Sequence, residues 1–209
     1  MTYLAYTGIG SRKTPTHIQA IMRHIGGYLC SQGWVLRSGA AQGADTAFED
    51  GAKAHDPNAR QEIYLPWVGF NHHPSDLHPR NIPFSQAEMD LSAQMHPAWD
   101  KCSPSARLLH QRNLRQLLGC EAVSGEQVVA SKFVVCWTEG GLMKGGTAQA
   151  LRIAQACNIP IVNFGRAANA EELEKLILEV DQLQTQFKTE FQSTLAMEPD
   201  HEPVSENRR

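Results

Sequence analysis

The sequence lacks three features that would each define a class of protein. Its 209 residues include five cysteines, an odd number, and no two of them form a C-x-x-C pair. We therefore expect reduced thiols and no disulfide framework. No apolar run approaches the roughly 20 residues that span a bilayer, and no basic start precedes an apolar leader segment. These absences predict a cytoplasmic protein without a membrane partner.

The sequence also lacks a strong excess of charge. The formal net charge is -3 and the isoelectric point is about 6.3, which excludes a global electrostatic attraction to nucleic acid but leaves room for a local basic patch. Hydrophobic residues make up 42% of the chain. That share is enough for a folded core, so a wholly disordered chain is excluded.

Short apolar segments alternate with amphipathic ones along the chain. We predict strands at 3–8, 34–39, 62–67, 132–138 and 159–164, with helices between them. The segment "SPSARLLHQRNLRQLLG" is a particularly clear helix, because Ser103 can cap it, Pro104 suits its first turn and Gly119 can end it. The alternating order predicts an α/β fold: an open, mostly parallel Rossmann-like sheet with helices on both faces.

The segments outside this core differ in composition. Residues 68–85 are rich in proline, asparagine and histidine and are interpreted as a long loop, which lies within an insertion at about 67–103. Apolar residues spaced by three and four predict one long C-terminal helix, whose stripe either covers the sheet or forms a homodimer contact: Leu173, Leu176, Val180, Leu183, Phe187 and Phe191. We predict a single domain over 1–195 and a disordered tail over 196–209.

Three glycine-rich segments, "TGIGSR", "RSGAAQGAD" and "TEGGLMKGGT", each follow a predicted strand and precede a helix. In a parallel sheet such loops meet at the carboxyl edge, where ligands bind. Glycine allows close backbone approach, and N–H groups at a helix start attract phosphate. We predict one anion site formed by these loops, with the following ligand-binding candidates: Gly8, Gly10, Ser11, Arg12, Ser38, Gly39, Gly43, Asp45, Gly145, Gly146 and Thr147.

The loops match neither common nucleotide-binding signature. Lys13 stands where the third glycine of G-x-G-x-x-G belongs, and Lys144 lacks the spacing of a Walker loop. The segment "NHHPSDLHP" gathers three histidines and Asp76, but its spacing matches no strong metal motif. It is interpreted as a polar loop or a lid over the ligand site. The sequence thus predicts no cofactor and no metal.

Taken in order, "GIGSRKTP", "SGAAQGADTAFEDGA", "LLHQRNLRQLLG" and "FVVCWTEGGLMKGGTAQALRIA" resemble the SLOG superfamily of Rossmann-like domains. The branch most similar is that of DNA-processing protein A (DprA), with its G-S-R loop and its R-N pair on a helix. Ala40 departs from that pattern, since a second glycine is usual there. The resemblance implies that Arg12 and Arg112 contact single-stranded DNA phosphates. It also implies that Asn113 contacts the ligand or, as an equal alternative, the loop backbone.

The LOG branch of the superfamily suggests an enzyme instead. Those phosphoribohydrolases carry P-G-G-x-G-T-x-x-E, and here Ala150 stands at the glutamate position. If the chain is an N-glycosidase, Asp45 or Glu139 would have to supply the catalytic carboxylate. A third hypothesis is a scaffold protein that dimerises through its long helix and whose glycine-rich loops bind no ligand. The missing glutamate favours a binding protein for a nucleotide or a phosphorylated ribose derivative, or for single-stranded DNA.

Overall fold

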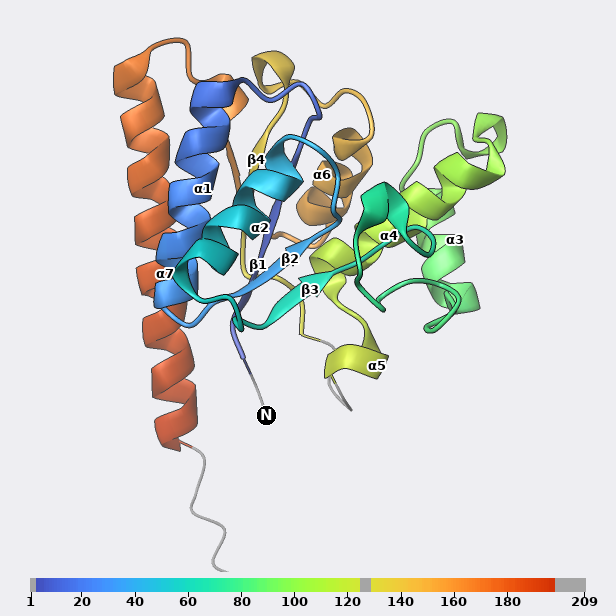
Figure 1. The fold of residues 1–209 in the computed structure, drawn as a ribbon, viewed down its shortest axis with the longest axis horizontal. Helices are drawn as coiled ribbons and strands as arrows, with labels where there is room; N and C mark the ends of the chain where they lie inside the picture. Colours follow the sequence, from blue (N-terminus) through green and yellow to red (C-terminus); the bar gives the residue numbers. More distant parts are fainter. Residues whose placement is uncertain (1–2, 125–128, 198–209) are drawn as a thin grey trace, which may run out of the picture.

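The computed structural model describes residues 3–124 and 129–197. Its core is a five-stranded sheet in the order β3-β2-β1-β4-β5, and the pairs β1–β2, β1–β4, β2–β3 and β4–β5 are all parallel. The predicted fold class is therefore confirmed (Figure 1). The strands are β1 Ala5–Gly10, β2 Val35–Ser38, β3 Gln61–Ile63, β4 Val134–Trp137 and β5 Ile161–Asn163.

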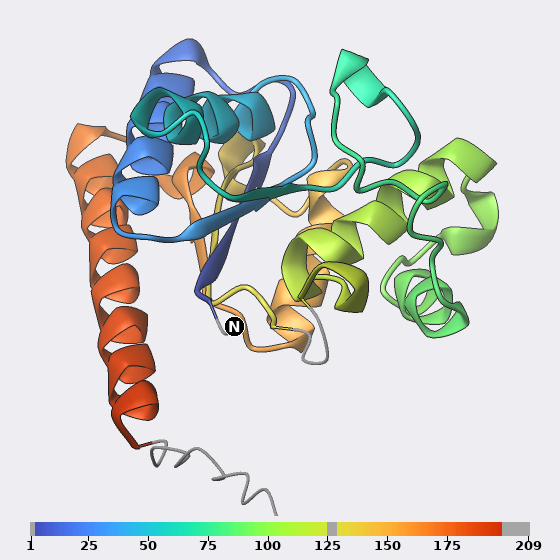
Figure 2. The same cartoon turned by 60° about the horizontal axis from the view of Figure 1, so that its bottom comes forward.

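Helices cover both faces of the sheet. On one side lie α1 (Thr16–Ser31), α2 (Ala44–His55) and α7 (Ala170–Met197), and on the other lie α4 (Pro104–Leu118) and α6 (Thr147–Ala156). Helix α3 (Gln86–Gln94) packs on α4, and the short α5 (Glu121–Ser124) follows α4. Figure 2 shows α3 and α4 on the side away from α7. Short 3-10 turns, including η2 (Trp99–Lys101) and η3 (Glu139–Gly141), lie in the connections.

Alternate side chains around β4 serve the two faces of the sheet. Phe133 and Val135 belong to the core shared with α1, α2 and α7, whereas Val134 and Cys136 belong to the core shared with α4 and α6. All four are fully buried. This alternation follows from the period of two in a strand, and burial on both faces explains the continuous apolar run in the sequence.

Local signals set the bounds of α4 as the sequence predicts. The Ser103 hydroxyl accepts a hydrogen bond from the Ala106 N–H at 3.2 Å, and Pro104 occupies the first turn. Gly119 ends the helix at φ 79°, a left-handed conformation that costs glycine little. These signals fix the register of α4, which determines which of its side chains face the sheet edge.

The apolar stripe of α7 is used inside the fold. Val180 is buried, and the other predicted stripe residues pack partly buried against the core of α1 and β4, with Phe187 stacked on Phe133 at 6.4 Å. This confirms that the stripe covers the sheet; the homodimer stays a prediction. The tail beyond residue 197 lies outside the described residues. Within them, none of the helices is both long and apolar enough to span a bilayer.

Strand ends differ from the prediction by a few residues. Strand β1 continues to Gly10 instead of ending at Gly8. A Cβ at Gly8 would lie 2.7 Å from the ring of Phe48 and 2.9 Å from Leu36. Gly8 therefore lets α2 pack closely on the sheet, and the loop proper begins at Ser11. Strand β3 is only three residues long, and after it the Leu65 N–H bonds the Leu77 carbonyl at 2.8 Å in place of a strand neighbour.

Candidate functional site

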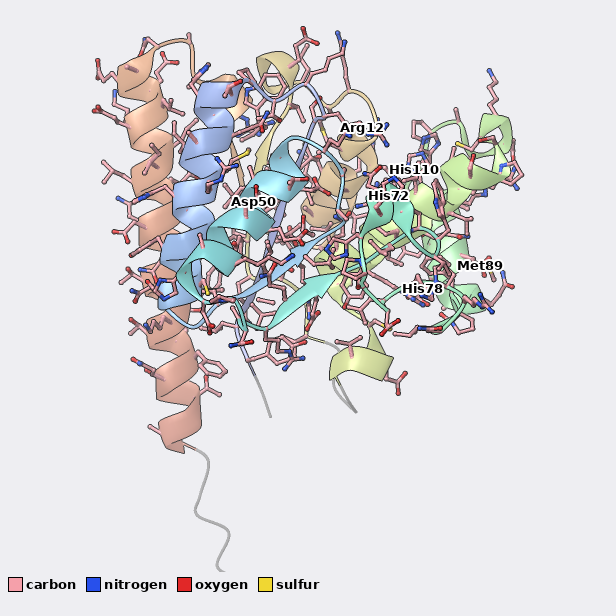
Figure 3. All side chains as sticks on the ribbon, in the orientation of Figure 1. Arg12, Asp50, His72, His78, Met89 and His110 are labelled. Carbon is pink, nitrogen blue, oxygen red and sulfur yellow. The ribbon has the colours of Figure 1, made fainter. Side chains whose placement is uncertain are left out.

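A cleft of about 670 Å³ lies at the carboxyl edge of the sheet. It sits where β1 and β4 are neighbours, the point at which the strand order reverses and where open α/β sheets bind ligands. All three glycine-rich segments reach it, through 10–13, through Ala41 and Asp45, and through 144–147. Helix α4 forms the opposite wall. In Figure 3, Arg12 on the first loop and His110 on α4 lie near each other across this region.

The cleft is positively charged although the chain as a whole is slightly acidic. Its lining includes Arg12, Lys13, Arg112 and Lys144 but a single carboxylate, Asp45. The four cations come from two loops and from α4, so only the folded chain brings them together. A concentration of one sign of charge in a low-dielectric cleft attracts an anion.

Asp45 joins two of the loops and α4. Its carboxylate accepts hydrogen bonds from the Gly10 N–H at 3.2 Å, from the Ala41 N–H at 3.4 Å and from Arg112 Nη1 at 3.5 Å. Burial raises the pKa of Asp45 despite these donors, and burial likewise lowers the pKa of Arg112 despite the carboxylate. Both side chains are nearly inaccessible. Asp45 thus positions the loops and Arg112.

Arg112 and Gln116 bring unused hydrogen-bond donors to the cleft. Arg112 Nε and Gln116 Nε2 are buried and have no partner among the described residues, although both side chains line the cleft. The Arg112 guanidinium lies 5.9 Å from the centre of the Phe70 ring, within the range of a cation–π contact. An unpaired buried donor costs on the order of 1–3 kcal/mol, so these two groups have hydrogen-bonding capacity that the described residues leave unused.

The third loop carries free backbone donors at the start of α6. The N–H groups of Gly145 and Gly146 make no hydrogen bond within 3–124 and 129–197. A Cβ at either glycine would meet nothing within 4 Å. Asn113 Nδ2 donates to the Gly146 carbonyl and to Gln149 Oε1, both at 3.1 Å. Of the two contacts predicted for Asn113, the structure contains the one with the loop backbone. Asn113 also lines the cleft.

The first loop has fewer free donors than its glycines suggest. The Gly10 N–H bonds Asp45, the Ser11 N–H bonds the Trp137 carbonyl at 3.0 Å, and the Lys13 N–H bonds Ser11 Oγ at 3.1 Å. This loop therefore presents side chains, above all the guanidinium of Arg12, rather than a nest of N–H groups. Thr147, at the third loop, also lines the cleft.

Five predicted residues lie outside the cleft lining: Gly8, Ser38, Gly39, Gly43 and Glu139. Ser38 Oγ donates to the Gly8 carbonyl at 2.7 Å and is fully buried. A Cβ at Gly39 would lie 1.3 Å from Arg112 Nη1, and a Cβ at Gly43 would lie 2.7 Å from the Ser11 carbonyl. These glycines allow the loops and α4 to approach. Glu139 stands on η3, exposed and away from the cleft.

Three residues that line the cleft were not among those predicted from the sequence: His96, His110 and Gln116. Burial, and then the neighbouring His96, lower the pKa of His110. The sequence does contain a signal for two of them. His110 and Gln116 each lie three residues from Asn113 on α4, so they share one face of that helix with the predicted Asn113. In the histidine-rich segment, His73 forms a hydrogen bond with the Glu49 carboxylate at 2.6 Å. His72 and His78 of the same segment are labelled in Figure 3. Residues 68–85 do not line the cleft.

No protein-family model matches the chain, and no curated protein matches it. Among solved structures, the chain is similar to DNA processing protein A from Helicobacter pylori, a protein that binds single-stranded DNA. The TM-score is 0.48 at 14% identity, over 88% of this chain and 82% of that one. It is also similar to the Moco carrier protein of Chlamydomonas rheinhardtii, with a TM-score of 0.42 at 18% identity, over 87% and 86% of the two chains. At these identities the likeness concerns the fold and assigns no ligand.

Proposed function

We propose that the cleft binds the phosphate group of a nucleotide or a phosphorylated ribose derivative. The single observation that carries this proposal is the combination of Arg12, Arg112 and Lys144 with the free N–H groups of Gly145 and Gly146 around one cavity. Guanidinium groups and N–H groups at a helix start are the usual protein donors to phosphate oxygens. The cavity of about 670 Å³ suits a small ligand.

The alternative function, hydrolysis of an N-glycosidic bond, has weaker support. Ala150 lines the cleft at the position of the expected glutamate, so a methyl group faces the space where the carboxylate would act. Asp45 is committed to Gly10, Ala41 and Arg112, and Glu139 does not line the cleft. Binding without chemistry is therefore the better-supported function.

Calorimetric titration tests the proposal with nucleoside monophosphates, the matching nucleosides and ribose 5-phosphate. We expect the phosphorylated compounds to bind and the nucleosides to bind far more weakly. Arg12→Ala and Lys144→Ala should each weaken binding about 10-fold, because each removes a charged contact. Arg23→Ala on α1 and Lys175→Ala on α7 are matched controls far from the cleft. Equal affinity for nucleosides and their monophosphates would refute the proposal.

Single-stranded DNA is the other source of the same phosphate chemistry. A DNA-binding cleft would prefer oligonucleotides to mononucleotides by a wide margin, and the logarithm of its affinity would fall steeply with the logarithm of salt concentration. Comparing a mononucleotide with oligonucleotides of increasing length at two salt concentrations separates the two ligands. The proposal expects affinity to level off at one nucleotide.

A further inference from the structure

A group of two histidines and one cysteine lies at the end of the cleft beside α4. His96 follows α3, Cys102 follows η2, and His110 lies in the second turn of α4. One nitrogen from each ring and the sulfur all lie within 4.8 Å of one another. Among the described residues, no other group of three metal-binding side chains lies this close together. The three residues come from separate segments, so the fold is what brings them together.

The geometry points to a zinc site formed by His96, Cys102 and His110, with one coordination position open to the cleft. Zinc takes nitrogen and thiolate ligands in a tetrahedral arrangement, at about 2.1 Å and about 2.3 Å, which separates the two ligand atoms by about 3.6 Å. His96 Nδ1 and Cys102 Sγ are 3.6 Å apart. This inference goes beyond the proposed function and does not depend on it.

The state of each ligand supports the assignment. His110 Nδ1 has no hydrogen-bond partner among the described residues, and the residue is 9% exposed. The His96 and His110 rings lie 4.3 Å apart at 44°, close enough for both to reach one ion. Among the residues that the structure describes, the Cys102 thiol has only weak contacts, with His96 and with the Ala98 carbonyl at 3.6 Å. Zinc would exchange these contacts for coordinate bonds.

The open position follows from which ligands line the cleft. His96 and His110 belong to its lining, together with Arg112 and Asn113, whereas Cys102 does not. An ion held by these three side chains therefore has the sulfur behind it and the cavity in front. Protein sites with three ligands and one open position are typical of zinc that contacts a substrate or water. The Ala98 N–H, which donates to His96 Nδ1 at 3.2 Å, would have to give up that contact if Nδ1 is the ligand atom.

Metal titration of the reduced, chelator-treated protein tests the site without any nucleotide. We expect one equivalent of zinc per chain by equilibrium dialysis, and a cobalt derivative with the absorption of a thiolate-to-metal charge transfer. Cys102→Ser should abolish that absorption and weaken zinc binding at least about 10-fold, the smallest loss seen when only an outer partner of a metal ligand is removed. His96→Gln should weaken binding similarly.

Two controls separate this site from adventitious binding. Cys157→Ser removes an exposed thiol far from the cleft, and His72→Asn removes a histidine of the histidine-rich segment. Both should leave stoichiometry and the cobalt spectrum unchanged. The assignment is wrong if no metal binds at one equivalent, if Cys102→Ser and His96→Gln bind zinc as the wild type does, or if cobalt shows no thiolate band. Circular dichroism of each variant confirms that it remains folded.

Discussion

Arg112 Nη1 lies 3.5 Å from Asp45 Oδ2, and both side chains are almost completely buried. Breaking such a pair on one side leaves a buried charge without a partner, which typically costs about 3–5 kcal/mol. We expect Arg112→Ala to lower the free energy of unfolding by this amount in urea denaturation. The double variant Asp45→Asn/Arg112→Ala should recover part of the loss. A double variant as unstable as the sum of the singles would show that the two side chains do not interact.

Two of the buried carboxylates, Glu62 and Asp45, should respond to acid in opposite directions. Arg37 and hydrogen bonds from Tyr3 and Tyr64 lower the pKa of Glu62, despite the opposing effect of burial. Its stabilising contribution is complete above its unfolded pKa near 4.5 and is lost as the pH falls through the lowered folded pKa. Glu62→Gln should therefore flatten the acid limb of stability measured against pH.

Asp45 has the opposite sign, because burial raises its pKa above 3.8. A carboxyl whose folded pKa is raised is destabilising when charged, and that cost is relieved as the pH falls from above the folded pKa to below 3.8. We expect Asp45→Asn to remove this relief, so that the variant loses more stability than the wild type on acidification over that window. Denaturant titrations at several pH values measure both slopes. Identical acid limbs for Asp45→Asn and wild type would contradict the prediction.

Two loop glycines provide a matched pair for stability. Gly43 has φ +86°, and a Cβ there would lie 2.7 Å from the Ser11 carbonyl, whereas Gly146 has helical φ and ψ and open space around it. Gly43→Ala should cost at least about 1–2 kcal/mol, the penalty for a left-handed residue with a side chain. Gly146→Ala should stay within about 0.5 kcal/mol. Thermal unfolding of the two variants measures the difference.

Helix α7 offers a similar comparison on a single element. Val180 is 1% exposed and Leu178 is 59% exposed. We expect Val180→Ala to cost about 1–3 kcal/mol through lost burial and the cavity left behind, and Leu178→Ala to be close to neutral. If Leu178→Ala instead lowers stability in a concentration-dependent way, the exposed side of α7 contacts a second copy of the chain.

The order of the elements could be predicted from sequence because strong local signals mark it. Local signals define both ends of α4: Ser103 and Pro104 at its start and Gly119 at its end. The apolar run at 133–136 likewise predicts a buried strand, which the structure contains as β4. The edge at which the glycine loops meet then follows from parallel topology alone. Contacts between distant segments could not be predicted in this way. Gly10 lies beyond the predicted strand by sequence, but pairing with Trp137 of β4 places it in β1.

The roles of individual site residues depend on distances that only the folded chain defines. Asp45 reads as a ligand contact by sequence, yet it accepts hydrogen bonds from Gly10 and Ala41 on two loops. Nothing in the spacing of 96, 102 and 110 matches a common metal motif, because α3, η2 and α4 must pack before those side chains meet. A carboxylate that holds loops together and a composite metal site are both tertiary features.

Because the carboxylate of Asp45 binds the first two loops but not the third, the loops around the cleft differ in how far they can adapt to a ligand. The first two loops are held in place without a ligand, since the Gly10 and Ala41 N–H groups donate hydrogen bonds to the Asp45 carboxylate. The third loop, at 144–146, is held by Asn113 Nδ2, which donates to the Gly146 carbonyl at 3.1 Å, but it has open space around Gly145 and Gly146. A rigid wall lowers the entropic cost of binding, and an adaptable wall can fit ligands of different shape. Substitutions in this third loop should therefore change ligand preference and, at Lys144, also the affinity for the anion.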